Sequence, residues 1–125
     1  MKIHLDTSFL IRAMIRDTVQ DLRLREWLTA GESVAITAIA WTEFLCGPVG
    51  PTDVELAREL IREQVAYHEE DASLAARLYN QSGRRSRSLT DCMIAASCIR
   101  SEATLATTDA KDFQRLIPLG LRLLT

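Results

Sequence analysis

The sequence predicts an α/β protein, with a mainly parallel sheet flanked by helices on both faces. Short apolar segments typical of buried strands alternate with helical segments along the whole chain. Strands separated by helices imply right-handed crossovers, which make neighbouring strands parallel. Isolated acidic residues follow several of the apolar segments. In parallel sheets, functional sites form where the C-terminal ends of strands meet the N-terminal ends of helices.

The first half of the chain shows patterns for a strand, two helices, a second strand and an apolar helix, at residues 2–6, 9–15, 19–29, 33–37 and 38–46. Thr7 and Ser8 are residue types that cap a helix, and they stand just before the first one. Gly31 follows the second helix. The turn 47–51, rich in glycine and proline, ends the apolar helix.

The second half predicts a helix, a strand, two more helices and two final strands, at residues 53–64, 65–68, 71–81, 90–101, 103–107 and 119–124. Ser82 and Gly83 end the helix before a basic loop at 84–88. Residues 111–113 are expected in a short turn or helix. There is no internal repeat, so we expect one domain spanning residues 1–125.

Composition restricts the function classes. The net charge of −2 provides no global field for nucleic acid, so binding to a polyanion needs a local basic patch or a metal ion. No apolar run approaches the ~20 residues that span a bilayer, and the N-terminus lacks a signal-peptide pattern. Cys46, Cys92 and Cys98 form no Cys-x-x-Cys pair, and a structural zinc site is not expected. We expect a cytoplasmic protein.

Four acids stand alone in apolar surroundings. Glu43 is the only charged residue between Val34 and Gly50, and Asp6 is the only acid from Ile3 to Ile11. Asp91 precedes eight uncharged residues, and Asp109 follows six. Helical spacing puts Glu43 and Asp91 in line with apolar stripes.

A buried carboxylate without a partner is costly, and no Lys or Arg stands nearby in sequence as an obvious partner. If the acids converge, each like-charged pair costs roughly 4 kcal/mol at ~4 Å and an effective dielectric of ~20. A divalent cation resolves both problems, and oxygen ligands favour Mg²⁺ or Mn²⁺ over zinc. Each acid also has a simpler structural explanation. Asp6 and Asp109 can cap helices, Asp91 can be a first-turn acid stabilised by the helix dipole, and Glu43 can form a buried ion pair.

The same segments resemble the PIN-domain ribonucleases, and especially the VapC-type toxins of toxin–antitoxin pairs. The resemblance covers essentially the whole chain in order, spacing and length. It is carried by residues 5–11, 42–44, 89–96 and 105–113.

The resemblance implies a PIN-like fold and a catalytic set of acids that hold Mg²⁺ or Mn²⁺. By position these acids are Asp6, Glu43, Asp91 and Asp109. Ser8 and Thr107 match polar positions beside them, and we expect both to contact substrate. The position of Ser8 is often Asn in the family. Asp112 is a rival for the fourth carboxylate.

The implied function is that of an endoribonuclease toxin of a type II toxin–antitoxin system, which hydrolyses RNA with metal-activated water. The implied partners are RNA, a cognate antitoxin and a second copy of the chain in a homodimer. The alternatives are a catalytically silent PIN-like RNA-binding module and a housekeeping PIN nuclease. A response-regulator receiver needs an acidic pair after the first strand and a lysine after a late strand, and this sequence shows neither. A haloacid-dehalogenase-type phosphatase needs Asp-x-Asp after the first strand, and here Ser8 occupies the third position.

Two surfaces are expected to bind partners. Arg84, Arg85 and Arg87 form a basic loop shortly before Asp91, where contact with RNA phosphates is expected. The alternatives for this loop are simple solvation or contact with acids of a protein partner. An apolar groove for an antitoxin helix is expected on the helices after Asp6 and around Glu43, formed by Phe9, Ile11, Trp41, Phe44 and Leu45.

Overall fold

A computed structural model describes residues 1–124 and contains one five-stranded sheet. Its strands are β1 (Lys2–Leu5), β2 (Ser33–Thr37), β3 (Glu63–Val65), β4 (Thr104–Ala106) and β5 (Leu123–Leu124). Their order across the sheet is β3-β2-β1-β4-β5, and every neighbouring pair is parallel. The predicted α/β class with a parallel sheet is therefore confirmed.

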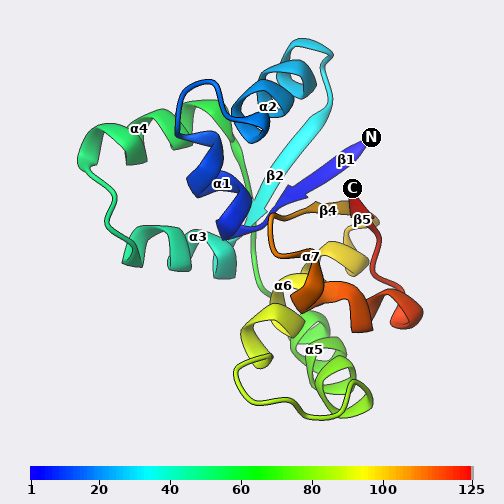
Figure 1. Ribbon diagram of the computed structural model, residues 1–125. Coiled ribbons are helices and arrows are strands. Elements are labelled where there is room, and N and C mark those ends of the chain that lie inside the picture. Colours follow the sequence, from blue (N-terminus) through cyan, green and yellow to red (C-terminus); the bar gives the residue numbers. More distant parts are fainter. Residues whose placement is uncertain (125) are drawn as a thin grey trace.

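The helices pack on both faces of this sheet (Figure 1). They are α1 (Thr7–Ala13), α2 (Val19–Thr29), α3 (Ala38–Cys46), α4 (Pro51–Leu60), α5 (Glu69–Gln81), α6 (Leu89–Arg100), α7 (Ala110–Phe113) and the 3₁₀ helix η1 (Gln114–Leu119). Figure 1 shows α1 and α2 on one side of the strands, and α5 and α6 on the other. None of the helices in the described residues combines the length and apolarity needed to cross a bilayer.

The strand register brings segments far apart in sequence to one edge of the sheet. Leu5 in β1 pairs with Ala106 in β4, so the residues that follow these strands are neighbours. The backbone N–H of Asp6 donates to the Ala106 carbonyl at 2.9 Å and extends the ladder by one residue. Asp6 and Thr107 are therefore placed side by side at the C-terminal edge.

The segment between α4 and α5 differs from the prediction. We expected a helix over residues 53–64 and a strand over 65–68. Instead α4 ends at Leu60, and β3 occupies Glu63–Val65. The edge strand β3 is largely exposed, so it lacks the apolar alternation that marks a half-buried strand. His68 is not in a strand but is the N-cap of α5, where Asp71 completes a capping box.

The apolar groove expected from sequence does not exist as such. Phe9, Trp41 and Phe44 belong to the buried core, where Phe9 stacks on Trp27 with ring centroids 5.4 Å apart. Ile11 and Leu45 remain exposed, at 40% and 43%. Aromatic side chains bury the most apolar area, so the core rather than the surface uses them.

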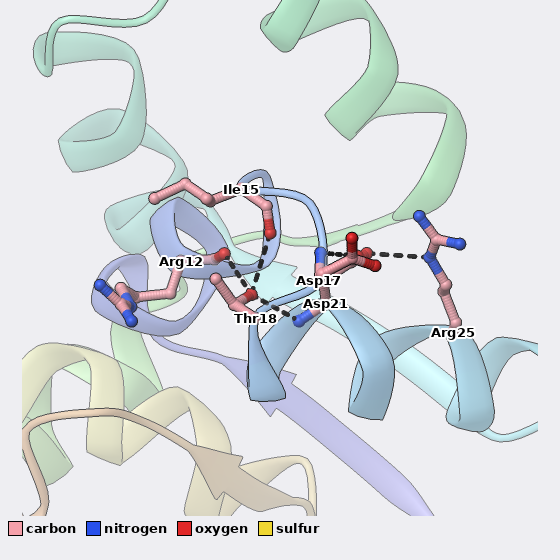
Figure 2. A network of polar contacts seen from close by, with 6 residues as sticks. All are labelled: Arg12, Ile15, Asp17, Thr18, Asp21 and Arg25. Atoms are coloured by element: carbon pink, nitrogen blue, oxygen red, sulfur yellow. Dashed lines mark hydrogen bonds and ion pairs between the residues drawn. The ribbon is translucent and has the colours of Figure 1, made fainter.

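The connection between α1 and α2 is held by a polar network (Figure 2). Thr18 caps α2 by accepting from the Asp21 N–H, and its hydroxyl also lies within hydrogen-bonding distance of the Arg12 carbonyl, at 2.8 Å. The Asp21 carboxylate accepts from the Asp17 N–H at 2.9 Å and from Arg25 Nε at 3.0 Å. The bond to Asp17 stabilises that residue in its left-handed conformation, with φ 66°.

Candidate active site

Two hydroxyl groups hold one oxygen of Asp6. Thr107 Oγ1 donates to Asp6 Oδ2 at 2.8 Å, and Ser8 Oγ donates to the same oxygen at 2.9 Å. In return, Ser8 Oγ accepts from the Thr108 N–H at 3.1 Å, and Thr107 Oγ1 accepts from the Asp109 N–H at 3.0 Å. The start of α1 and the loop after β4 are thus joined around a single carboxylate.

The same geometry also gives Ser8 and Thr107 a positioning role. Both hydroxyls lie within donating distance of Asp6 Oδ2, and they lie 3.2 Å from each other. When each directs its single proton to Asp6, both side chains hold that carboxylate in place. The expected contact with substrate stays a prediction.

Asp6 is buried, only 5% exposed. It occupies the N-cap position of α1, yet its side chain makes no capping hydrogen bond there. Burial is the main reason that the pKa of Asp6 is raised above its usual value, and the bonds from Thr107 and Ser8 oppose the rise only in part. The negative charge of Asp109 raises this pKa further. Helix capping therefore does not explain the residue.

Glu43 is joined to the same site by Thr7. The Thr7 hydroxyl contacts both the Ala40 carbonyl, at 2.9 Å, and Glu43 Oε1, at 3.0 Å, so it links the first turn of α1 to α3. Glu43 is exposed rather than buried in the core. Even so, desolvation by neighbouring atoms raises its pKa, the Thr7 hydroxyl opposes this, and the charge of Asp6 adds to the rise. No ion pair within residues 1–124 involves Glu43, so the ion-pair explanation fails.

Asp91 has the most perturbed carboxyl of the set. It lies in the first turn of α6, where the helix dipole alone would favour the charged form. Nevertheless its pKa is raised to about 7, first by burial and then by the negative charges of Asp6, Asp112 and Glu43. The repulsion expected between converging acids is therefore present.

Asp109 and Asp112 both contribute negative charge, each to a different neighbour. The charge of Asp109 acts on Asp6, and that of Asp112 acts on Asp91. Asp109 is the N-cap of α7 but makes no side-chain capping bond. Asp109 is thus close enough to act on Asp6, and Asp112 on Asp91, while their roles in the site stay predictions.

The acids of this site offer carboxylate oxygens, the kind of ligand that a hard divalent cation prefers. The ion pairs within residues 1–124 involve Glu32, Asp21 and Asp71, and none of the acids of this site. Among those residues, no three Asp, Glu, His or Cys side chains come close enough to enclose a metal ion. Mg²⁺ usually retains several waters and uses one or two carboxylates together with substrate phosphates. The site fits that mode of binding and does not fit a metal enclosed by three or more side chains.

The basic loop between α5 and α6 is exposed and conformationally defined. Arg84 donates to the Asn80 side chain, and its guanidinium carbon lies 5.3 Å from the centroid of the Tyr79 ring. Arg84 and Arg87 both have a positive φ, 52° and 67°. Arg85 and Arg87 extend into solvent. None of the three forms an ion pair with an acid among the described residues, so the loop keeps its positive charge uncompensated.

Comparison with known proteins gives one family. The model of a family described as PIN domain matches residues 3–117. No curated protein matches the chain significantly.

Solved structures with a similar fold include several toxin–antitoxin proteins. A chain of VapBC2 from Rickettsia felis, bound to a DNA fragment from its promoter, has a TM-score of 0.82 at 19% identity, over 99% of this chain and 98% of that one. VapBC-1 from nontypeable Haemophilus influenzae gives 0.77 at 19% identity, covering 99% and 97%. VapBC-5 from Mycobacterium tuberculosis, of the VapBC family of toxin–antitoxin systems, gives 0.63 at 25%, covering 99% and 98%. At this identity the first two show the fold alone.

Proposed function

The chain belongs to the PIN domain family, and from this premise we propose that it is a metal-dependent endoribonuclease, the toxin of a type II toxin–antitoxin pair. The observation that carries the nuclease proposal is the electrostatic convergence on Asp91. Asp6 before α1, Glu43 in α3 and Asp112 in α7 all raise the pKa of one carboxyl, and no ion pair within residues 1–124 involves these acids. Such an excess of negative charge is typical of a cation site that serves phosphate chemistry.

The residues divide into binding and positioning roles. One or two of Asp6, Glu43 and Asp91 would hold Mg²⁺ or Mn²⁺ directly. The remaining acids, with Asp109 before α7 and Asp112 in α7, would act through waters of the cation. Ser8 and Thr107 hold Asp6 through its Oδ2.

When bound, the cation supplies Lewis acidity toward water and phosphate and neutralises charge that develops in the reaction. Asp91 is the best candidate to accept the proton of the attacking water. A base works best when its pKa lies near the working pH. The pKa of Asp91 is about 7 in the metal-free site, and a bound cation would lower it. Thr7 holds Glu43 toward the site, and the hydroxyl pair keeps Asp6 in one orientation.

The test is incubation of the purified protein with defined single-stranded RNAs, with Mg²⁺, Mn²⁺ or EDTA. Cleavage is expected only with metal, and Asp91→Asn should nearly abolish it. Asp53→Asn, which changes an exposed acid in the first turn of α4, is the matched control and should cleave like the wild type. Undiminished cleavage in EDTA or by Asp91→Asn would contradict the assignment. RNA binding without cleavage would instead support a silent RNA-binding module.

An antitoxin is the protein partner that we propose, because the solved relatives are toxin–antitoxin complexes. The surface that fits it is a cleft of about 380 Å³ between α1, α2 and α4. Its apolar lining comes from Ala13, Met14, Leu24, Leu28, Leu56 and Leu60. Arg16, Asp21 and Arg25 supply its polar lining, with two cations to one acid. This pattern matches an amphipathic helix that also carries acidic side chains.

Two of the elements that line this cleft are connected by the polar network of Figure 2. The network around Thr18 and Asp21 joins the end of α1 to the start of α2, so these two walls are fixed relative to each other. A preformed groove lowers the ordering cost of binding. A homodimer and a cytoplasmic location remain predictions, and the molecular mass of the purified protein in solution tests the former.

A further inference from the structure

Arg115 lies at the acidic site and was not singled out by any sequence motif. It is the second residue of η1, directly after the short helix that carries Asp112. Its positive charge lowers the pKa of Asp91, against the effect of the surrounding acids. Asp6, Glu43 and Asp91 have raised pKa values, and among the described residues Arg115 is the cation whose charge opposes this rise at one of them, Asp91.

The guanidinium of Arg115 has spare hydrogen-bonding capacity. One terminal nitrogen donates to the Asp112 carbonyl at 3.5 Å, which is a weak bond at the limit of the usual range. Its Nε is buried and has no hydrogen-bond partner among residues 1–124. A guanidinium presents five N–H donors, and an unpaired buried donor is costly. The Nε–H therefore lacks an acceptor in the protein alone, and the terminal nitrogens hold only the weak bond to Asp112.

The missing acceptor is not one of the acids. No ion pair within 4.0 Å joins Arg115 to a carboxylate in the described part of the chain. The planar fork of a guanidinium matches the oxygens of a phosphate, and it keeps its charge at all physiological pH values. An RNA phosphate that approaches these carboxylates meets like charge, so a fixed cation beside them has a clear use.

We propose that Arg115 binds an oxygen of the RNA phosphate that lies against the carboxylates, and so is a further substrate-binding residue of this site. The inference rests on the proposed nuclease function. The loop arginines are less suited to this position, because Arg84 is already engaged by Asn80 and Tyr79 and the loop extends into solvent. They would contact flanking phosphates, whereas Arg115 would contact the one at the acids.

The test compares Arg115→Ala, Arg115→Gln and Arg115→Lys with Arg122→Ala. Arg122 is an exposed arginine after η1, so its replacement removes the same charge away from the acids. Three quantities are measured for each variant: cleavage of a single-stranded RNA in Mn²⁺, binding of that RNA in Ca²⁺ without cleavage, and affinity for Mn²⁺ alone. Thermal melting establishes which variants fold, and the Gln variant replaces the Ala variant if the latter does not.

We expect Arg115→Ala and Arg115→Gln to reduce cleavage about tenfold to a hundredfold and to weaken RNA binding, with no loss of Mn²⁺ affinity. Arg115→Lys should retain only part of the cleavage and RNA binding, because lysine lacks the planar guanidinium that matches phosphate oxygens. Unchanged cleavage, full restoration by lysine, or a loss explained by weaker Mn²⁺ binding would overturn the proposal. If the wild type cleaves no RNA, the nuclease function fails, whereas weaker RNA binding by Arg115→Ala would still support the phosphate contact.

Discussion

Thr107 donates its hydroxyl proton to Asp6 Oδ2 at 2.8 Å, across 101 residues of sequence. The same hydroxyl accepts from the Asp109 N–H, so one side chain joins the first acid of the site to the loop that carries the fourth. Neither Asp6 nor Asp109 uses its carboxylate as a helix cap. The orientation of Asp6 therefore depends on this hydroxyl and on that of Ser8.

The first prediction is that Thr107→Val, which keeps the shape and removes the hydroxyl, lowers cleavage without unfolding the protein. Asp6 loses one of two hydroxyl donors, so its pKa should rise further and the acid limb of the pH–rate profile should move to higher pH. The loss in the free energy of unfolding should be about 1–2 kcal/mol. Thr108→Val is the control, because that side chain is exposed and only its backbone N–H contacts the network. Equal profiles for both variants would contradict the positioning role.

The second prediction concerns the stability of the metal-free protein as a function of pH. The pKa of Asp91 is raised from 3.8 to about 7 in the folded state, so between these values the folded chain keeps a proton that the unfolded chain has released. Stability from this group is therefore lost as the pH rises through that window. Asp91→Asn should flatten this part of the profile and leave the metal-free protein no less stable at pH 7. Denaturant unfolding from pH 4 to 8 measures both, and a much less stable variant would make Asp91 a structural residue.

Metal should reverse this effect in the wild type. A cation that binds only the folded state stabilises it by ~2.7 kcal/mol at a hundredfold excess over its dissociation constant. Thermal melts with and without Mn²⁺ provide the measurement, and Asp91→Asn should respond less.

The third prediction separates the site from a structural ion pair elsewhere. Asp71 has a fully buried side chain, and its carboxylate accepts from Arg100 and from the His68 N–H, the latter at 2.8 Å. Although burial opposes ionisation, these partners hold the pKa of Asp71 below its usual value. The stability from this group is thus present above the unfolded value of 3.8 and is lost as the pH falls below it.

Removing the partner of this buried acid should be costly. We expect Arg100→Ala to lower the free energy of unfolding by about 2 kcal/mol or more, because it leaves Asp71 charged and buried. Arg25→Ala is the matched control, since it removes an i,i+4 pair in which the arginine is 63% exposed, worth about 0.3–0.5 kcal/mol. Urea unfolding of both variants at pH 7 compares them, and similar losses would show that the Asp71 pair contributes no more than a surface pair.

The sequence was most informative where charge interrupts an apolar run. The helices at 19–29 and 38–46 have the predicted bounds, and the five strands are parallel as expected. Lone acids such as Glu43 indicated the site, because a charged residue on an apolar stripe needs a reason. The exposed edge strand β3 shows no apolar pattern of this kind. The predicted helix was therefore extended beyond Leu60 to residue 64, into the segment that the strand occupies.

Other features depend on contacts between distant segments. Ser8 and Thr107 were predicted as site residues, but only the geometry shows that both hydroxyls lie within hydrogen-bonding distance of the same Asp6 oxygen. Arg115 lies in a 3₁₀ helix that the sequence did not predict, among residues with no recognisable motif. The aromatic residues expected to form a groove are in the core. A helix that is apolar on two faces has the same local sequence pattern whether its second apolar face is exposed or buried, so the pattern could not decide between a groove and the core.

The fourth prediction concerns the basic loop. Replacing Arg84, Arg85 and Arg87 with Ala should weaken binding to single-stranded RNA and leave Mn²⁺ affinity unchanged. If all three contact phosphates, the slope of log affinity against log salt should fall by roughly two, at about 0.7 per contact. Arg58→Ala, Arg62→Ala and Arg77→Ala combined is the charge-matched control, because these exposed arginines lie outside the loop. An unchanged slope would mean that the loop is solvated or serves a protein partner.

The fifth prediction tests where the antitoxin binds. Leu56 lines the cleft between α1, α2 and α4 and is 42% exposed, whereas Leu45 is 43% exposed on α3 outside the cleft. The two residues have the same side chain and nearly the same exposure, so Leu56→Glu and Leu45→Glu differ mainly in position. Leu56→Glu places a charge where an apolar stripe should pack and adds repulsion toward an acidic partner. It should weaken the complex about tenfold, or ~1.4 kcal/mol, and leave cleavage unchanged.

The measurement uses the antitoxin that we expect to be encoded next to this gene. Expression of the chain alone should arrest growth, and co-expression with that protein should relieve the arrest and give a complex that co-purifies. Leu56→Glu should arrest growth even in the presence of the partner, because the nuclease is intact and its inhibitor binds poorly. Leu45→Glu should be relieved as the wild type is. The reverse pattern would return the interface to α3, one of the two helices on which the sequence predicted it. Harmless expression of the wild type alone would contradict the toxin function itself.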